Sequence, residues 1–101
     1  MNGIEEEYVS FETAKLLREK GFDDVCRAFI AAPSQSVVMR WLREVHNINI
    51  EIFTYWTKDK SMVYGNRIVR NNAILKEIDT AYNSYEEACE NSIKYCLENL
   101  I

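Results

Sequence analysis

The sequence predicts an α+β fold, in which an antiparallel sheet of three or four strands is covered on one face by three helices. Three segments place apolar residues at helical spacing, near the start, before residue 47 and at the end of the chain. Between residues 48 and 82 the apolar pattern instead alternates with a period of two, as in half-buried strands. Turn residues separate the strand segments, so consecutive strands would form a meander, and the whole a two-layer sandwich.

The composition is that of one globular domain. Of the 101 residues, 48% are hydrophobic and 28% are charged, close to the average for such domains. We therefore expect a single domain over residues 1–101, with a core that needs neither a metal nor a disulfide. The first eight residues are acidic, and we expect them to form a disordered tail.

The N-terminus and the cysteines favour a cytoplasmic location. A secretory signal begins with basic residues, whereas this chain begins with MNGIEEEYVS, and no apolar run approaches the ~20 residues of a membrane span. The chain has an odd number of cysteines, which are Cys26, Cys89 and Cys96. Cys89 and Cys96 would lie about 10 Å apart on one helix, which is too far for a disulfide. Reduced thiols are typical of a reducing compartment.

The first helix is predicted between Ser10 and Gly21. Ser10 is a good N-cap, and Glu12 lies in the first turn, where the helix dipole favours an acid. Gly21 can adopt the left-handed conformation that ends a helix, which would let Phe22 pack back on Leu17. The expected apolar stripe consists of Phe11, Ala14, Leu16 and Leu17.

The next segments are a short strand and a second helix. Residues 25–30 have strand-like alternation, and Pro33 would stop that strand. Pro33 or Ser34 starts the helix, and Asn47 ends it. The inward face of this helix should carry Val37, Val38, Trp41, Leu42 and Val45.

Residues 48–82 should then form three strands. In INIEIFTYW one face would carry Ile48, Ile50, Ile52, Thr54 and Trp56. We expect that face to be core, so that Trp56 on the strand and Trp41 on the preceding helix are both core residues. The opposite face, with Phe53 and Tyr55, is expected to be exposed or to meet a partner. A turn at residues 57–61 leads to a return strand in which Gly65 marks a bulge. Asn71–Asn72 make a tight turn into a third strand.

The last helix is the most clearly marked element. Ser84 and Glu87 have the spacing of a capping box. Polar residues occupy the opposite side of this helix from a broad apolar stripe. The stripe contains Tyr85, Ala88, Cys89, Ile93, Cys96, Leu97 and Leu100.

No pattern in the sequence predicts catalysis, a cofactor or a metal. His46, the single histidine, has no partner at ligand spacing and is better explained as interacting with a helix C-terminus. Cys89 and Cys96 lie on an apolar stripe, where thiols are small core residues. Adjacent acidic residues have simpler explanations than catalysis. Residues 5–7 belong to a solvated tail, residues 23–24 to a loop, and residues 86–87 to the start of a helix. We therefore expect a protein that is not an enzyme.

The most informative charge feature is a basic segment between two acidic ones. Residues 58–76 contain five bases and one acid. They could form a hairpin that binds nucleic acid, or one that meets an acidic helix of a second copy in a homodimer. The sequence pI of about 5.0 makes nucleic-acid binding the less favoured interpretation. The candidate interaction surface contains Phe53, Tyr55, Lys58, Lys60, Tyr64, Arg67 and Arg70.

Three blocks of the sequence carry a resemblance. YVSFETAKLLREKGFDDVCRAF, APSQSVVMRWLREVHNINIEIFTYW and YNSYEEACENSIKYCLENLI resemble a group of short, uncharacterised proteins of Bacteroides-type gut bacteria and their phages and mobile elements. This resemblance implies no activity, cofactor or catalytic residue. The strand followed by the SYEEA helix is more faintly similar to HicB-type antitoxins. The leading hypothesis is a protein–protein interaction domain that could associate with itself. The alternative is an antitoxin-like regulator that binds nucleic acid through its basic hairpin.

Overall fold

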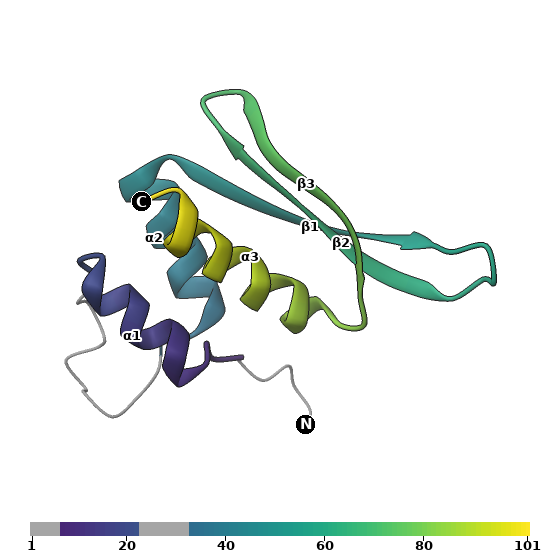
Figure 1. Ribbon diagram of the computed structural model, residues 1–101, viewed down its shortest axis with the longest axis horizontal. Helices are drawn as coiled ribbons and strands as arrows, with labels where there is room; N and C mark the ends of the chain where they lie inside the picture. The colour runs from purple at the N-terminus through teal and green to yellow at the C-terminus, as the bar shows by residue number, and fades with distance from the viewer. Residues whose placement is uncertain (1–6, 23–32) are drawn as a thin grey trace.

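The protein has three helices and a three-stranded antiparallel sheet within the described residues. The structure is a computed structural model that describes residues 7–22 and 33–101, except for the side chains of residues 77–80. The elements follow in the order α1 (Phe11–Glu19), α2 (Gln35–His46), β1 (Ile48–Trp56), β2 (Met62–Arg70), β3 (Ala73–Tyr82) and α3 (Tyr85–Asn99). The sheet order is β1-β2-β3 (Figure 1). The α+β fold is confirmed, and the strand predicted at residues 25–30 lies outside the described residues.

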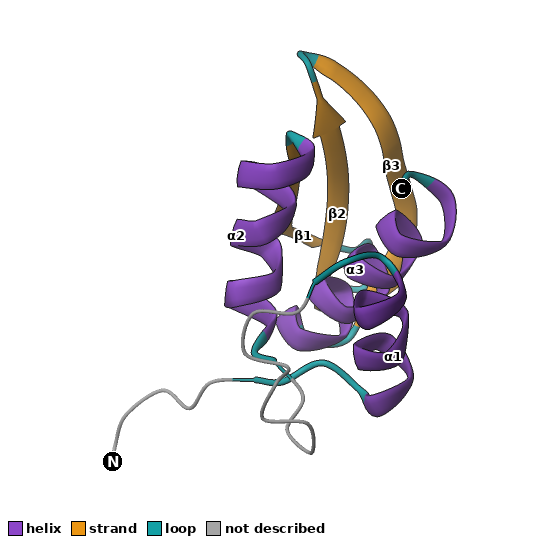
Figure 2. Ribbon diagram, turned by 90° about the vertical axis from the view of Figure 1, so that its left-hand side faces the viewer, coloured by secondary structure: helices purple, strands orange, loops and turns teal. Residues whose placement is uncertain are grey.

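The helices and the sheet form two layers. α3 contacts all three strands, α2 contacts β1 and α3, and α1 packs on α3 (Figures 1 and 2). The face of the sheet toward the helices is called here the inner face, and the opposite face the outer face. The core lies between the layers and contains Leu17, Phe22, Val38, Leu42, Ile48, Ile50, Ile68, Ile93 and Leu97.

Local sequence signals explain where the helices begin and end. The hydroxyl groups of Ser10, Ser34 and Ser84 each accept a hydrogen bond from a backbone N–H in the first turn of the helix that follows. Gly21 has a φ of 95°, and the Phe22 N–H donates to the Leu17 carbonyl at 3.0 Å, as in a Schellman ending. These predicted caps are confirmed.

The asparagines predicted at the turns are also confirmed in their roles. Asn47 ends α2 with a φ of 61°. Asn71 and Asn72 have φ values of 53° and 66° and join β2 to β3 in a two-residue loop. Such a pair of positive φ values matches the right-handed twist of the strands on either side, which is why this loop keeps the hairpin in register.

The two strand pairings differ in regularity. β1 and β2 pair without a shift over their whole length, from Ile48 opposite Arg70 to Trp56 opposite Met62. The pairing of β2 with β3 shifts twice, and one of the shifts lies at Gly65. This confirms the irregularity predicted at that glycine.

Some predicted burials are wrong. Trp56, expected in the core, is 70% exposed because the β1–β2 hairpin extends past the helices (Figure 1). Phe11 is 77% exposed because α1 buries Thr13, Ala14 and Leu17, a face to which Phe11 does not belong. Val45 lies on the buried stripe of α2 but is 61% exposed at its last turn.

The expectation of a disordered tail over residues 1–8 is also wrong for its last two residues, Glu7 and Tyr8. Tyr8 forms an isolated antiparallel bridge with Ser34, and the Glu7 carbonyl accepts from the Gln35 N–H at 2.8 Å. These contacts attach residues 7 and 8 to the start of α2. Residues 1–6 lie outside the described part of the chain.

Candidate interaction surface

Two aromatic rings lie across a glycine on the outer face of the hairpin. Phe53 and Tyr55 are neighbours on this face of β1, with ring centroids 6.1 Å apart. Gly65 of β2 is paired with Phe53. A Cβ atom at Gly65 would lie 2.8 Å from ring carbons of Phe53 and 3.2 Å from a ring carbon of Tyr55. The missing side chain is therefore what lets both rings lie close to the sheet.

Arg67 completes this aromatic surface. Its guanidinium carbon lies 5.6 Å from the centroid of the Phe53 ring, within reach of a cation–π interaction. The same side chain forms an ion pair with Glu51 at 3.0 Å. Within the chain, Arg67 therefore already has both an anion and a ring as partners.

The turn between β1 and β2 holds two exposed lysines. The side chain of Asp59 accepts hydrogen bonds from the Thr57 hydroxyl and the Ser61 N–H, and these bonds hold the pKa of the Asp59 carboxyl below its usual value. Lys60 has a φ of 68°. Lys58 and Lys60 are exposed on this hydrogen-bonded turn.

The inner face of the hairpin end is apolar and exposed. The hairpin end is defined here as residues 55–63, which lie beyond the last pair between β2 and β3, Tyr64 opposite Tyr82. Trp56 and Met62 are cross-strand partners there and are 70% and 45% exposed. The sequence prediction missed this surface because alternation alone does not show where the helices stop.

Two residues of the predicted surface lie elsewhere. The structure brings Phe53, Tyr55 and Arg67 together on the outer face, with Lys58 and Lys60 at the turn. Tyr64 and Arg70 belong to the inner face. The Tyr64 ring lies edge-on to Tyr85, with centroids 6.5 Å apart, and Arg70 donates to the Leu100 carbonyl at 3.3 Å. The predicted set is therefore not one continuous surface.

The remaining reactive side chains have structural roles. Burial raises the pKa of the Cys89 and Cys96 thiols to about 11 and about 12, so both are protonated core residues, as predicted. The His46 ring packs edge-on against Trp41 at 4.7 Å. Burial, and then the charge of Arg70, lower the pKa of His46. Its Nε2 is buried and has no hydrogen-bond partner among the described residues, so that atom forms no bond to the last carbonyls of the helix.

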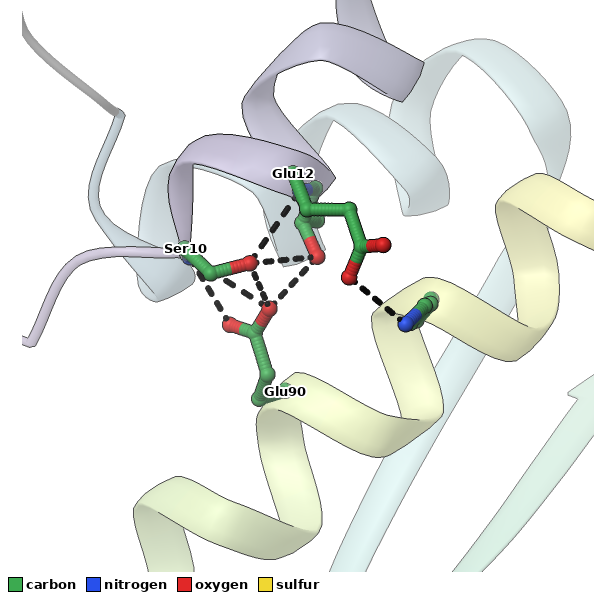
Figure 3. A network of polar contacts seen from close by, with 5 residues as sticks. Ser10, Glu12 and Glu90 are labelled. Carbon is green, nitrogen blue, oxygen red and sulfur yellow. Dashed lines mark hydrogen bonds and ion pairs between the residues drawn. The ribbon is translucent and has the colours of Figure 1, made fainter.

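A polar network joins α1 to α3 (Figure 3). The Glu90 carboxylate accepts from the Ser10 N–H at 3.3 Å, from the Ser10 hydroxyl at 2.9 Å and from the Thr13 hydroxyl. Lys94 forms an ion pair with Glu12 at 2.9 Å. Glu90 thus caps the N-terminus of α1 from another helix and attaches the first turn of α1 to α3. Every contact in this network is explained by packing of the fold.

The comparisons with known proteins returned no matches. No family model, no curated protein and no solved structure matches this chain. The resemblance to short proteins of gut bacteria and their mobile elements stays a prediction. No helix in the described parts of the chain is long and apolar enough to cross a membrane. No group of His, Cys, Asp and Glu within the same parts is placed to hold a metal ion.

Proposed function

We propose that this chain is a non-enzymatic protein-binding domain of the cytoplasm, with the β1–β2 hairpin as its contact surface. The observation that carries the proposal is the exposure of Trp56 and Met62 beyond the helices. Tryptophan and methionine are enriched in protein interfaces, and tryptophan is prominent among residues that dominate binding energy. A hairpin end with such residues extends from the core at a cost in apolar exposure, which a partner would remove.

The outer face supports the same function. Phe53 and Tyr55 place two rings on the outer face, with Tyr55 in the hairpin end and Phe53 just before it, and both are only half-buried. Arg67 and Glu51 neutralise each other, so the surface around the rings contains few unpaired charges. A weakly charged aromatic surface is better suited to protein than to phosphate.

The alternative is a nucleic-acid-associated or antitoxin-like regulator that uses the basic segment. Its support is weaker, because three of the five bases have partners within the chain. Arg67 pairs with Glu51, Arg70 donates to the Leu100 carbonyl, and Lys76 lies 4.6 Å from the centroid of the Tyr95 ring. Lys58 and Lys60 remain, exposed at the turn. If a panel of labelled RNA and DNA is not bound at ~50 mM salt, this alternative is wrong.

The test of the proposed function compares the removal of exposed apolar side chains from the hairpin end with the removal of one from α1. Trp56→Ser with Met62→Ser removes the apolar side chains of the hairpin end, and Phe11→Ser removes an equally exposed ring on α1 as the matched control. Circular dichroism first establishes that both variants keep the fold. The measurements are light scattering after size exclusion, for self-association, and quantitative pull-down from a bacterial lysate, for other proteins.

We expect the hairpin variant to lose binding and the control to keep it. The outer face is tested in the same assay with Phe53→Ser and Tyr55→Ser together. Loss of association with an intact fold would place these rings in the interface as well. A wild-type chain that is monomeric at every concentration and retains no protein in a hairpin-dependent way would overturn the proposal.

A further inference from the structure

The two edges of the sheet are unequally protected against pairing with another strand. β3 contains Lys76, Glu77 and Asp79, and its pairing with β2 shifts twice. Charges and bulges of this kind are the usual means by which proteins prevent edge-to-edge association. β1 is nine residues long, has an unshifted register and contains one charged residue, Glu51. Within the described parts of the chain, no strand pairs with its free side.

The hydrogen-bonding phase of β1 shows which groups point to that free side. The Thr57 N–H donates to the Ser61 carbonyl at 2.9 Å, and this pair continues the β1–β2 register. In an antiparallel ladder, hydrogen-bonded pairs alternate with pairs that are not bonded to each other. Thr57 and every second residue before it are therefore hydrogen-bonded to β2. The residues between them direct their N–H and C=O groups away from β2. These residues are Ile48, Ile50, Ile52, Thr54 and Trp56.

We infer that two copies of this chain pair antiparallel through their β1 edges, with Ile52 on the two-fold axis, so that the two sheets become one. This inference rests on the proposed function and names its partner as a second copy. Ile52 is the midpoint of β1, so this register pairs the whole strand. It places Ile50 opposite Thr54 and Ile48 opposite Trp56 of the second copy. Each of these residues has its N–H and C=O directed to the free edge.

The charges on β1 favour this register over the neighbouring one. A two-fold axis at Glu51 would place two carboxylates directly opposite each other, which is destabilising. With the axis at Ile52, each Glu51 lies opposite Phe53 of the second copy. The Arg67 guanidinium lies over that ring, 5.6 Å from its centroid within one chain. Glu51 of each copy then lies beside Arg67 of the other copy. Acids and arginines alternate around the two-fold axis, so the interface is complementary in charge.

The same pairing explains two exposed apolar side chains. A two-fold axis perpendicular to the sheet keeps the helices of both copies on one side. Trp56 then lies beside Ile48 of the second copy, which follows Val45 by three residues and the last residue of α2, His46, by two. Trp56 is 70% exposed and Val45 is 61% exposed in one copy. α2 contacts β1, the strand with the free edge, so pairing through β1 brings a second copy close to both elements.

The first test substitutes Thr54, whose backbone groups take part in the β1–β1 pairing of the two copies and not in the pairing with β2. Thr54→Pro removes an N–H that points away from β2, and proline is tolerated on edge strands. Thr54→Lys is the second variant, because a charge on the edge opposes pairing without restricting the backbone. Ile74→Lys places the same charge on β3, where Ile74 is 58% exposed, and is the matched control.

Light scattering after size exclusion and analytical ultracentrifugation measure the assembly. We expect a wild-type dimer of about twice the 11.9 kDa chain mass. Either Thr54 variant should raise its dissociation constant about tenfold or more. The proline removes a ladder hydrogen bond at two symmetric positions, and the lysine places a charge on the edge of each copy. Ile74→Lys should leave the dimer intact. Circular dichroism verifies the fold of each variant, and the lysine variant keeps the test valid if the proline variant does not fold.

Amide hydrogen exchange gives an independent test on the unmodified chain. The amides of Ile50, Ile52 and Thr54 should exchange quickly at low protein concentration and slowly at high concentration. The amides of Glu51 and Phe53, which pair with β2, should be protected at both. Protection of the first set at every concentration would mean that another segment of the same chain occupies the edge, and would overturn the inference.

The failure of this inference can be separated from failure of the proposed function. A dimer that survives both Thr54 substitutions associates through another surface, so the β1 pairing is wrong while protein binding stands. A monomer that retains another protein through Trp56 and Met62 leads to the same conclusion. A monomer without any hairpin-dependent partner overturns both.

Discussion

The two ends of the β1–β2 hairpin share one strand pattern and one register but have opposite environments. At the end near the helices, Ile48 and Ile50 are 0% and 6% exposed. At the other end the same face carries Thr54 and Trp56, and Trp56 is 70% exposed. Both ends are regular in register and rich in β-branched or aromatic residues. The difference teaches that a strand pattern defines a face, whereas the helices decide how much of that face becomes core.

The largest expected effect contrasts the two ends directly. Ile50→Ala should lower the free energy of unfolding by about 2–4 kcal/mol, because it leaves a cavity under the helices. Trp56→Ala should change it by about 0.5 kcal/mol or less, although it removes more atoms, because its side chain is exposed. Urea denaturation at low protein concentration measures both. Equal losses would mean that the hairpin end is covered within one chain.

The next largest effect concerns the outer face of the hairpin. Gly65→Ala should lower stability by about 1–2 kcal/mol, because the added Cβ displaces the Phe53 ring from its position 2.8 Å away. In a Phe53→Ala background the same substitution should cost less, since only the Tyr55 ring carbon at 3.2 Å then lies close to the added Cβ. A double-mutant cycle by urea denaturation measures this coupling. Additive losses would mean that the rings do not pack on Gly65.

The helix layer should weaken without any change at the hairpin end when Glu90 is removed. Glu90→Ala deprives the Ser10 backbone and the Thr13 hydroxyl of their acceptor, which should cost about 1–2 kcal/mol. Glu98→Ala, on the exposed side of the same helix, is the control and should leave stability unchanged. Amide exchange should show faster opening of α1 in the Glu90 variant alone. Faster exchange at residues 55–63 would contradict this separation of the two regions.

The smallest effect is a pH dependence at the covered end. The pKa of His46 lies below its ordinary value of 6.5 in the folded chain, because the ring is buried and near Arg70. The unfolded chain therefore binds a proton first, so stability should fall as the pH decreases below 6.5 and until the folded pKa is passed. His46→Gln should remove this part of the pH dependence. Proton NMR of the single histidine measures its pKa, and a value above 6.5 would contradict the prediction.

Much of the fold could be predicted because its signals are local. Ser10, Ser34 and Ser84 cap helices through bonds within four residues, and Gly21 and Asn47 end helices through their own φ values. Strand alternation and the Asn71–Asn72 loop likewise depend on near neighbours. Such signals act whatever the rest of the chain does.

The candidate surface was predicted only in part, because its limits depend on distant segments. Phe53, Tyr55 and Arg67 lie together on the outer face, whereas Tyr64 and Arg70 belong to the inner face. Element length was an available signal for Trp56. A nine-residue strand spans about 30 Å, whereas the twelve-residue helix α2 spans about 18 Å, so the strand must extend beyond the helix that covers it.

By itself, the sequence determined the element types, their order, their ends and the antiparallel meander, because each follows from periodicity and from bonds between near neighbours. Only the tertiary structure decided which apolar side chains are core. Trp41 and Trp56 have equally apolar side chains, yet Trp41 packs on Phe22 and His46 while Trp56 lies beyond the helices. Burial is a property of what lies opposite a side chain, and in this protein that is α2 and α3 at one end of the hairpin. At the other end we propose that it is a second copy.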